Sequence, residues 1–466
     1  MAHMSKISRS NAVHFGHLFI NTKMDILIKN GTVVNADSSF KADVAVHRGK
    51  IVSVGRMAEG AAKASKVIDA SGCLVFPGGI DPHVHMQLPT PAGPSSDDFL
   101  SGSRAALMGG TTTLFDFVTP APGELLPAAL ALRQAEAHAA VTNLFLHVSP
   151  TIWRKTMPDE MAECVEKSHT RSFKCYLAYL DTIGLLPEAL EKVMKEAARL
   201  NATVLVHCEE GKEVARLREK YAKSNLPVAT AHYLSRPPEL EAQAVDTAIG
   251  LARKTGCKLY IVHVSAAESL VLIAKAQAAG QKVVAETCPH YLLLDEQKYH
   301  QTFIEAAPYI ISPPLRKAEH QQALWKALAD GTIQTIGSDH CPFLLQQKME
   351  GKNDLRKIPN GAGGAEHRLS LLYTYGVLTG KISLNRFVEL TSTNAARIFG
   401  LYPAKGIITP GADADIVVWN PEKASIISHR THHQHCDSNI YEGMQTKGAA
   451  DYVVLDGRVV VGDNRD

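Results

Sequence analysis

The chain has 466 residues, which is room for one α/β barrel of about 250 residues or more and a smaller second domain. Its 49 basic and 47 acidic side chains give a net charge of +2, which does not favour a nucleic-acid partner or an anionic membrane surface. It has no run of about 18 apolar residues, so no membrane span is expected. The start shows no secretion signal and the eight cysteines form no CxxC pair, so we expect a cytoplasmic protein with reduced thiols.

Both ends of the chain have the alternating pattern of β-strands. The strand candidates are Asp25–Ala36, Ala42–Gly55, Lys66–Ala70, Ala414–Trp419 and Asp451–Val461, with turn signals at Asn30-Gly31, Arg48-Gly49-Lys50 and Asp456-Gly457. We expect the two ends to form one small β-sandwich domain, made of residues 22–74 and 405–466.

Between these ends, short apolar runs alternate with helical stretches. The expected strands are Val75–His85, Thr111–Val118, Asn143–Ser149, Ser172–Tyr179, Thr203–Cys208, Lys258–Ser265, Lys282–Cys288 and Thr332–Asp339. The expected helices are Asp97–Met108, Leu126–Ala139, Pro158–Lys167, Pro187–Leu200, Glu239–Thr255, Ala266–Ala279, Glu319–Ala329, Arg368–Leu378 and Leu384–Ile398. This alternation predicts an α/β fold with a parallel (β/α)8 TIM-type barrel over residues 75–404.

Metal-competent side chains stand at the carboxyl ends of several predicted barrel strands. His83 and His85 share one face of their strand because successive side chains alternate. His207, His263 and Asp339 also follow apolar runs. Because barrel active sites lie at this end of the strands, the pattern predicts a metal site there.

Lys174 lies in a strand that is otherwise apolar and aromatic, Ser172-Phe-Lys-Cys-Tyr. A buried lysine is rare because its charge is costly to desolvate. One interpretation is an ion pair with a neighbouring carboxylate. The other is a neutral amine that has taken up CO₂, giving an N6-carboxylysine that bridges two metal ions. The six ligand candidates suit two divalent ions, with Zn²⁺ the default and Mn²⁺, Co²⁺ or Fe²⁺ as alternatives.

The motifs resemble the dihydropyrimidinase/hydantoinase group, the cyclic amidases of the amidohydrolase superfamily. The matching segments are Pro77-Gly-Gly-Ile-Asp-Pro-His-Val-His, Ser172-Phe-Lys, Val206-His-Cys-Glu, Val262-His-Val-Ser, Glu286-Thr-Cys-Pro-His-Tyr, Ser312-Pro-Pro-Leu-Arg and Gly337-Ser-Asp-His-Cys-Pro. The resemblance runs from about Asp25 to Val461. It implies metal binding by His83, His85, Lys174, His207, His263 and Asp339, and substrate binding by Tyr179, Ser312 and Asn360.

The resemblance also implies a reaction and a substrate class. A hydroxide that bridges the two metal ions attacks the ring carbonyl of a small cyclic amide, a dihydropyrimidine or hydantoin. Tyr179 donates a hydrogen bond to the oxyanion, and Asp339 carries the proton to the leaving nitrogen. The product is an N-carbamoyl amino acid. Members of the group are commonly homotetramers, so we expect a homotetramer or a homodimer.

Two other activities share these metals. An allantoinase that hydrolyses a cyclic ureide stays open, whereas a dihydroorotase would need a cationic clamp after His85, and Met86–Ser96 contains no arginine. A non-catalytic scaffold is a third alternative, disfavoured because every ligand candidate is retained. The Thr90-Pro91-Ala92 loop departs from relatives that carry bulkier residues there, which leaves the preferred ring substituent open.

Two further groups of residues could be mistaken for functional sites. His429, His432, His433 and His435 form a dense cluster near the C-terminus, which we interpret as a surface connection without a catalytic role. Cys208, Cys288 and Cys341 lie near the ligand candidates and are interpreted as packing residues.

Overall fold

The computed structural model describes residues 24–57, 63–168 and 171–462. Eight parallel strands follow one another around a barrel in chain order. They are β6 (Gly79–Val84), β7 (Thr111–Val118), β8 (Asn143–Val148), β9 (Ser172–Tyr176), β10 (Thr203–His207), β11 (Lys258–Ile261), β12 (Val283–Thr287) and β13 (Thr335–Ile336). A parallel bridge between Val84 and His340 brings the first strand beside the segment after the last, which closes the barrel.

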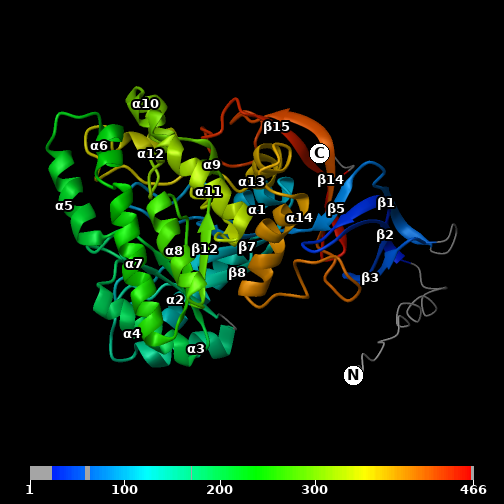
Figure 1. Cartoon of the computed structure of the whole chain (residues 1–466), viewed down its shortest axis with the longest axis horizontal. Helices are drawn as coiled ribbons and strands as arrows, with labels where there is room; N and C mark the ends of the chain where they lie inside the picture. Colours follow the sequence, from blue (N-terminus) through cyan, green and yellow to red (C-terminus); the bar gives the residue numbers. More distant parts are fainter. Residues whose placement is uncertain (1–23, 58–62, 169–170, 463–466) are drawn as a thin grey trace, which may run out of the picture.

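Helices surround these strands, and Figure 1 shows them on the outside of the barrel. They are α1 (Phe99–Met108), α2 (Leu126–Ala137), α3 (Met157–Ser168), α4 (Pro187–Arg199), α5 (Gly211–Ala222), α6 (Val228–Leu234), α7 (Pro238–Thr255), α8 (Ala267–Ala278), α9 (Pro289–Leu293), α10 (Phe303–Ala306), α11 (Ala318–Asp330), α12 (Leu345–Met349), α13 (Arg368–Leu372), α14 (Leu384–Val388) and α15 (Asn394–Ile398). Short 3-10 turns are η1 (Glu296–His300) and η2 (Ala307–Tyr309), and π-helical segments are η3 (Tyr373–Val377) and η4 (Glu389–Thr393). No helix within the described ranges has the length and apolar character needed to span a membrane.

A second sheet joins the two ends of the chain. Its strands are β1 (Met24–Val34), β2 (Ser39–His47), β3 (Lys50–Gly55), β4 (Ala64–Asp69), β5 (Leu74–Pro77), β14 (Ile416–Ile426), β15 (Gln445–Leu455) and β16 (Arg458–Val461). β5 lies between β1 and β14, so it connects the N-terminal and C-terminal strands. In Figure 1 the blue and the orange-red strands lie together at one side of the barrel. Ile28, Val44, Ile68, Ile416 and Val454 pack in one core inside this sheet.

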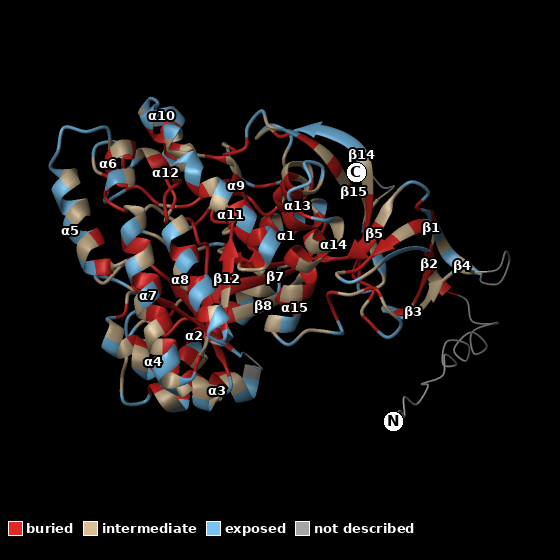
Figure 2. Ribbon diagram, viewed as in Figure 1, coloured by how far each residue is buried: buried red, intermediate tan, exposed pale blue. Residues whose placement is uncertain are grey.

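Figure 2 shows that the barrel strands other than the half-buried β8 are almost wholly buried and that the helices expose one face. Every residue of β7, β9 and β10 is buried. Parallel strands covered on both faces have this character, which is why their sequences are nearly continuous apolar runs. A polar side chain in such a strand therefore needs a partner inside the barrel or at its rim.

The predicted barrel and the β domain from both chain ends are confirmed, and two local predictions are wrong. Val75–His85 is not one strand, because β5 ends at Pro77 and belongs to the terminal sheet, whereas β6 begins the barrel. Asn30-Gly31 is not a hairpin turn. β1 continues through it with a bulge, Asn30 has a φ of 64°, and the chain reverses between Asn35 and Ser38 instead.

The boundaries 22–74, 75–404 and 405–466 stay a prediction, because β5 crosses the first of them and residues 22, 23 and 463–466 lie outside the described ranges. The turns at Arg48-Gly49 and Asp456-Gly457 occur as expected, with positive φ at all four residues. The helices α5, α6, α9, α10 and α12 were not expected. Figure 1 places α6, α10 and α12 together at the upper left, where they extend the loops of the barrel.

Aromatic side chains join the terminal sheet to the barrel helices. The Trp419 ring of β14 lies 5.6 Å from Phe76 of β5 and 5.5 Å from Tyr373 of η3, measured between ring centroids. Phe387 of α14 lies 5.6 Å from Phe76. Trp419 is 1% exposed, so it fills the joint between the two parts.

We expect Trp419→Ala to lower the free energy of unfolding by about 3–5 kcal/mol, because it removes a large buried ring and leaves a cavity. Ile426→Ala is the matched control, since Ile426 ends the same strand and is 62% exposed; it should change stability by less than about 0.5 kcal/mol. Urea titration followed by circular dichroism measures both. Equal losses in the two variants would contradict this role of Trp419.

Candidate metal centre and active site

The first group of ligand candidates converges at the rim of the barrel. His83 Nε2 lies 3.2 Å from His85 Nε2 and 3.1 Å from Asp339 Oδ1, and His85 Nε2 lies 3.3 Å from the same oxygen. Within residues 24–57, 63–168 and 171–462, this is the one set of three His, Cys, Asp or Glu residues whose ligand atoms all lie within 4.8 Å of one another. Two ring nitrogens and a carboxylate oxygen at such distances need a proton or a cation between them.

The second group lies next to the first. His207 ends β10 and its Nδ1 is 3.0 Å from Nε2 of His263, which follows β11. The His263 ring centroid is 5.4 Å from that of His83, so the four imidazoles form one continuous cluster. Phe117 of β7 packs against His83 and His85 with ring centroids 4.8 and 4.7 Å apart, which closes the cluster on the side of the barrel core.

Lys174 of β9 is 1% exposed and faces this cluster from the same barrel interior. Its Nζ lies 4.7 Å from the Phe117 ring centroid and 5.2 Å from that of Tyr176. No ion pair or hydrogen bond joins Nζ to any carboxylate of the described chain. Burial lowers the pKa of Lys174 to about 8, so its neutral form is more accessible than that of an exposed lysine. The ion-pair interpretation of this lysine is therefore not supported.

Burial favours the neutral, metal-binding form of three of the imidazoles. Burial lowers the pKa of His83 and of His263 well below the usual value, and it also lowers the pKa of His207. Burial acts in the opposite direction on Asp339, but the adjacent histidines outweigh it and keep the pKa of that carboxyl well below its usual range. The rim therefore presents neutral nitrogen donors together with an ionised carboxylate.

Two buried carboxylates behind the imidazoles fix their orientation. Glu286 Oε1 accepts a hydrogen bond from His83 Nδ1 at 2.7 Å, and its Oε2 accepts one from the Tyr260 hydroxyl at 2.6 Å. Glu209 Oε2 accepts from His207 Nε2 at 2.7 Å and is also bonded to Arg236. Such carboxylate partners leave the other ring nitrogen free for a ligand and raise its basicity.

Sequence reasoning did not assign Glu286 and Glu209, although both lie in the motifs quoted above. The available signal was a carboxylate at the end of a barrel strand, in Glu286-Thr-Cys and His207-Cys-Glu. Which carboxylate meets which imidazole depends on contacts between strands, and a single sequence does not contain that information.

Three site residues have left-handed backbone conformations that side chains other than glycine rarely adopt. Tyr179, His263 and Asp339 have φ values of 59°, 39° and 50°. Strain of this kind persists where surrounding contacts over-determine the conformation, and it is concentrated at functional sites. Each ligand group contains one residue with this strained backbone, and Tyr179 is a third. This clustering supports the assignment of the rim as the functional site.

The candidate substrate residues lie around the same rim. The Tyr179 ring centroid is 5.2 Å from that of His207. Asn360 Nδ2 donates to Ser312 Oγ at 2.9 Å, whereas Asn360 Oδ1 is buried without a partner among the described residues. An amide oxygen in this state can accept a hydrogen bond from a ligand N–H group.

The C-terminal histidines do not assemble a metal site in the described chain. His429 Nδ1 is bonded to Glu442 at 3.0 Å, His433 Nδ1 to Glu366 at 2.8 Å, and His432 Nε2 to the carbonyl of Cys436 at 2.9 Å. Each of these three rings therefore has its own partner. Cys208, Cys288 and Cys341 are buried free thiols whose pKa burial raises, which agrees with a packing role.

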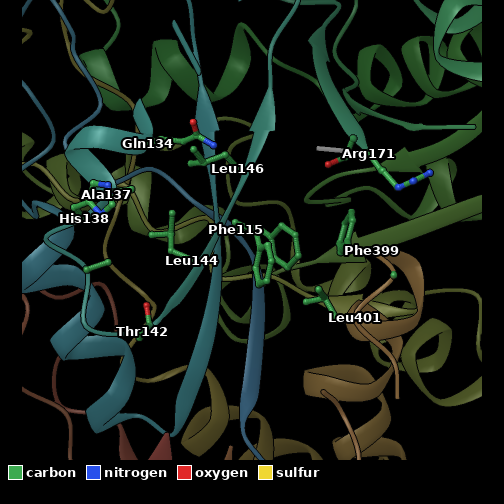
Figure 3. Close-up of a pocket in the computed structure, with 14 residues that line it drawn as sticks. Phe115, Gln134, Ala137, His138, Thr142, Leu144, Leu146, Arg171, Phe399 and Leu401 are labelled. Atoms are coloured by element: carbon green, nitrogen blue, oxygen red, sulfur yellow. The ribbon is translucent and has the colours of Figure 1, made fainter. Parts of the chain in front are cut away.

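A cavity of about 800 Å³ lies away from this rim, at the amino ends of β8 and β9 (Figure 3). Phe115, Leu144, Phe399 and Leu401 give it an apolar wall, and Arg171 is at its edge. Here β8 and β9 are paired only at Val148 and Phe173, whereas β7 and β8 are paired over six residues. The cavity contains none of the ligand candidates, so it is not the metal centre.

Comparison with known proteins agrees with this geometry. The model of the amidohydrolase family matches residues 74–460. A D-hydantoinase from Geobacillus stearothermophilus is 41% identical, covering 95% of this chain and 94% of the relative, and a dihydropyrimidinase from Arabidopsis thaliana is 39% identical, covering 93% and 82%. The crystal structure of dihydropyrimidinase from Brevibacillus agri superimposes with a TM-score of 0.91 at 40% identity, over 94% and 95% of the two chains. The chain is therefore a hydrolase of the amidohydrolase family and belongs to its dihydropyrimidinase and hydantoinase branch.

Proposed function

We propose that this enzyme opens the ring of dihydropyrimidines and hydantoins by hydrolysis and releases N-carbamoyl amino acids. One observation carries the proposal: two converging groups of imidazoles and Asp339 meet beside a buried lysine that forms no ion pair in the described chain. The names of relatives about 40% identical over nearly the whole chain support the substrate class.

The donor set fits two divalent metal ions, with Zn²⁺ as the expected species. His83, His85 and Asp339 would hold one ion, and His207 and His263 the other. Lys174 would bridge them after its neutral amine takes up CO₂, which turns a buried cation into an anion with two oxygen donors. Ions bound here would acidify a water molecule and polarise the ring carbonyl. Nitrogen and oxygen donors without thiolate suit this choice of metal.

The protein side chains transfer the proton, stabilise the oxyanion and hold the substrate. In the ring-opening step a C–O bond to water forms and the ring C–N bond breaks. Asp339 accepts a proton from the attacking water at its carboxylate and returns it to the leaving nitrogen. Burial raises the pKa of Tyr179, so its phenol stays protonated at neutral pH and donates to the developing oxyanion. Ser312 and Asn360 would hold the amide edge of the ring.

Assembly into a homotetramer or homodimer and a cytoplasmic location stay predictions. The same holds for a cyclic ureide as substrate, the allantoinase alternative, against which the names of the relatives argue only indirectly. The scaffold alternative is disfavoured further, because the ligand candidates are present and also converge in space.

A substrate panel tests the proposal. Zinc-reconstituted protein is incubated with dihydrouracil, hydantoin, 5-phenylhydantoin and allantoin, and the loss of each ring is followed. We expect the first three to open and allantoin to persist. Opening of allantoin alone would place the enzyme with the allantoinases, and no reaction together with no bound metal would favour a scaffold.

We expect Tyr179→Phe to lower kcat by roughly 10²–10³-fold, because it removes one donor to the oxyanion. Metal content should stay as in the wild type, since Tyr179 is not a ligand candidate. Tyr221→Phe is the matched control, because Tyr221 lies on α5 and is not among the candidate site residues. Unchanged turnover in Tyr179→Phe would exclude the tyrosine from the reaction.

A further inference from the structure

We propose that the short helix α12 sets the spacing of the segments that hold the substrate, through Lys348 and Gln347 as positioning residues. This inference rests on the proposed function. It assigns roles to two residues that follow Asp339 in the chain but belong to neither ligand group.

Lys348 connects the two segments that contain Ser312 and Asn360. Its side chain is 1% exposed, and its Nζ donates to the carbonyls of Ile310 at 2.9 Å and Gly361 at 2.7 Å. Ile310 lies two residues before Ser312, and Gly361 directly follows Asn360. The Gly361 N–H also donates to the carbonyl of Ile310 at 3.0 Å. The pair formed by Ser312 and Asn360 therefore rests on a backbone junction that Lys348 ties together.

A buried lysine is a costly way to fill space, so its contacts need an explanation. No carboxylate of the described chain forms an ion pair with Lys348; its neighbours are the Phe343 ring, 5.6 Å away, and the thiols of Cys341 and Cys436. Burial lowers the pKa of Lys348 to about 7. Both the ammonium and the neutral amine have at least two N–H groups, so the two carbonyls are satisfied in either form.

Gln347 acts on the opposite segment, the loop after His85. Its Nε2 donates to the carbonyls of Ala92 at 3.1 Å and Pro94 at 2.8 Å, while its Oε1 accepts from the backbone of Leu344 at 2.9 Å. The loop begins beside the ligand group, since Ser95 Oγ donates to the carbonyl of His85 at 2.9 Å. Gln347 thus fixes how far this loop stands from α12.

Adjacent residues of one helix therefore hold two segments that border the metal centre. Lys348 holds the segment with Ser312 and Asn360, and Gln347 holds the segment with Ala92 and Pro94. Because both are anchored to α12, this helix determines the room between them. Loss of the Lys348 anchor should weaken binding of every ring alike, whereas loss of the Gln347 anchor should affect a small unsubstituted ring and a ring with a bulky substituent differently.

The test compares steady-state kinetics of the zinc-loaded enzyme on hydantoin and 5-phenylhydantoin. Lys348→Met keeps an unbranched chain that is only one atom shorter and removes its donors. We expect KM to rise roughly ten-fold for both substrates, the scale of a lost pair of hydrogen bonds, with a much smaller change in kcat. Gln347→Leu should instead shift the ratio of the two kcat/KM values by about three-fold or more, because it frees only the loop after His85.

The chain offers matched controls for both variants. Lys352→Met and Gln346→Leu change exposed side chains of the same type in the same segment, and neither should alter KM or the substrate ratio. If Lys348→Met does not fold, Lys348→Arg takes its place. Arginine keeps N–H donors but places them farther from the backbone, so KM should still rise. Circular dichroism and metal content should stay as in the wild type.

The outcomes separate this inference from the proposed function. A wild-type enzyme that opens neither substrate contradicts the proposed function. An active wild type whose Lys348 variants keep the wild-type KM, or a Gln347→Leu enzyme with the wild-type substrate ratio, contradicts the role of α12 and leaves the proposed function standing. A loss that is equal for both substrates in both variants would also contradict it, because that is the effect of general destabilisation.

Discussion

The burial of Lys174 beside four imidazoles and one carboxylate is the constraint on which the site depends. A lysine enclosed by Phe117 and Tyr176 has lost its hydration, and no carboxylate of the described chain forms an ion pair with it. Burial also lowers the pKa of His83 and His263 beside it. An arrangement of this kind is unfavourable as a purely structural core, whereas it suits the binding of cations that satisfy several of these groups together.

The barrel explains how residues more than 250 positions apart meet in this way. Parallel strands in chain order bring all their carboxyl ends to one rim, so His83, His207, His263 and Asp339 need only occupy the end of a strand or the residues that follow it. The orientation of each ligand side chain is set by residues that hold the ligands and by the local backbone. Glu286 and Glu209 select which nitrogen of a histidine faces the centre, and left-handed backbone conformations at His263 and Asp339 direct their side chains.

The sequence was sufficient for the barrel because buried parallel strands are short apolar runs, and polar residues at their ends stand out. It was insufficient where one pattern fits two structures. The apolar run around Val75 and Ile80 does not show that its halves belong to different sheets, since both halves are buried. Asn30-Gly31 fits a hairpin turn and a bulge equally well, and the bulge prevails because Asn30 is hydrogen-bonded to Asp43 and Asp69 of neighbouring strands. The five-residue helix α12 is too short for a periodic signal. The partners of Lys348 and Glu286 are set by tertiary contacts.

The central claim is that six side chains form a two-metal centre with a carboxylated lysine. Crystals of the zinc-loaded enzyme, measured with X-rays at the zinc absorption edge, test it most directly. The account predicts two anomalous peaks per chain, one beside His83, His85 and Asp339 and the other beside His207 and His263, with a carbamate on Lys174 between them. Two ions bound beside an unmodified Lys174, or a single ion that leaves His207 and His263 bonded only to each other, would contradict it.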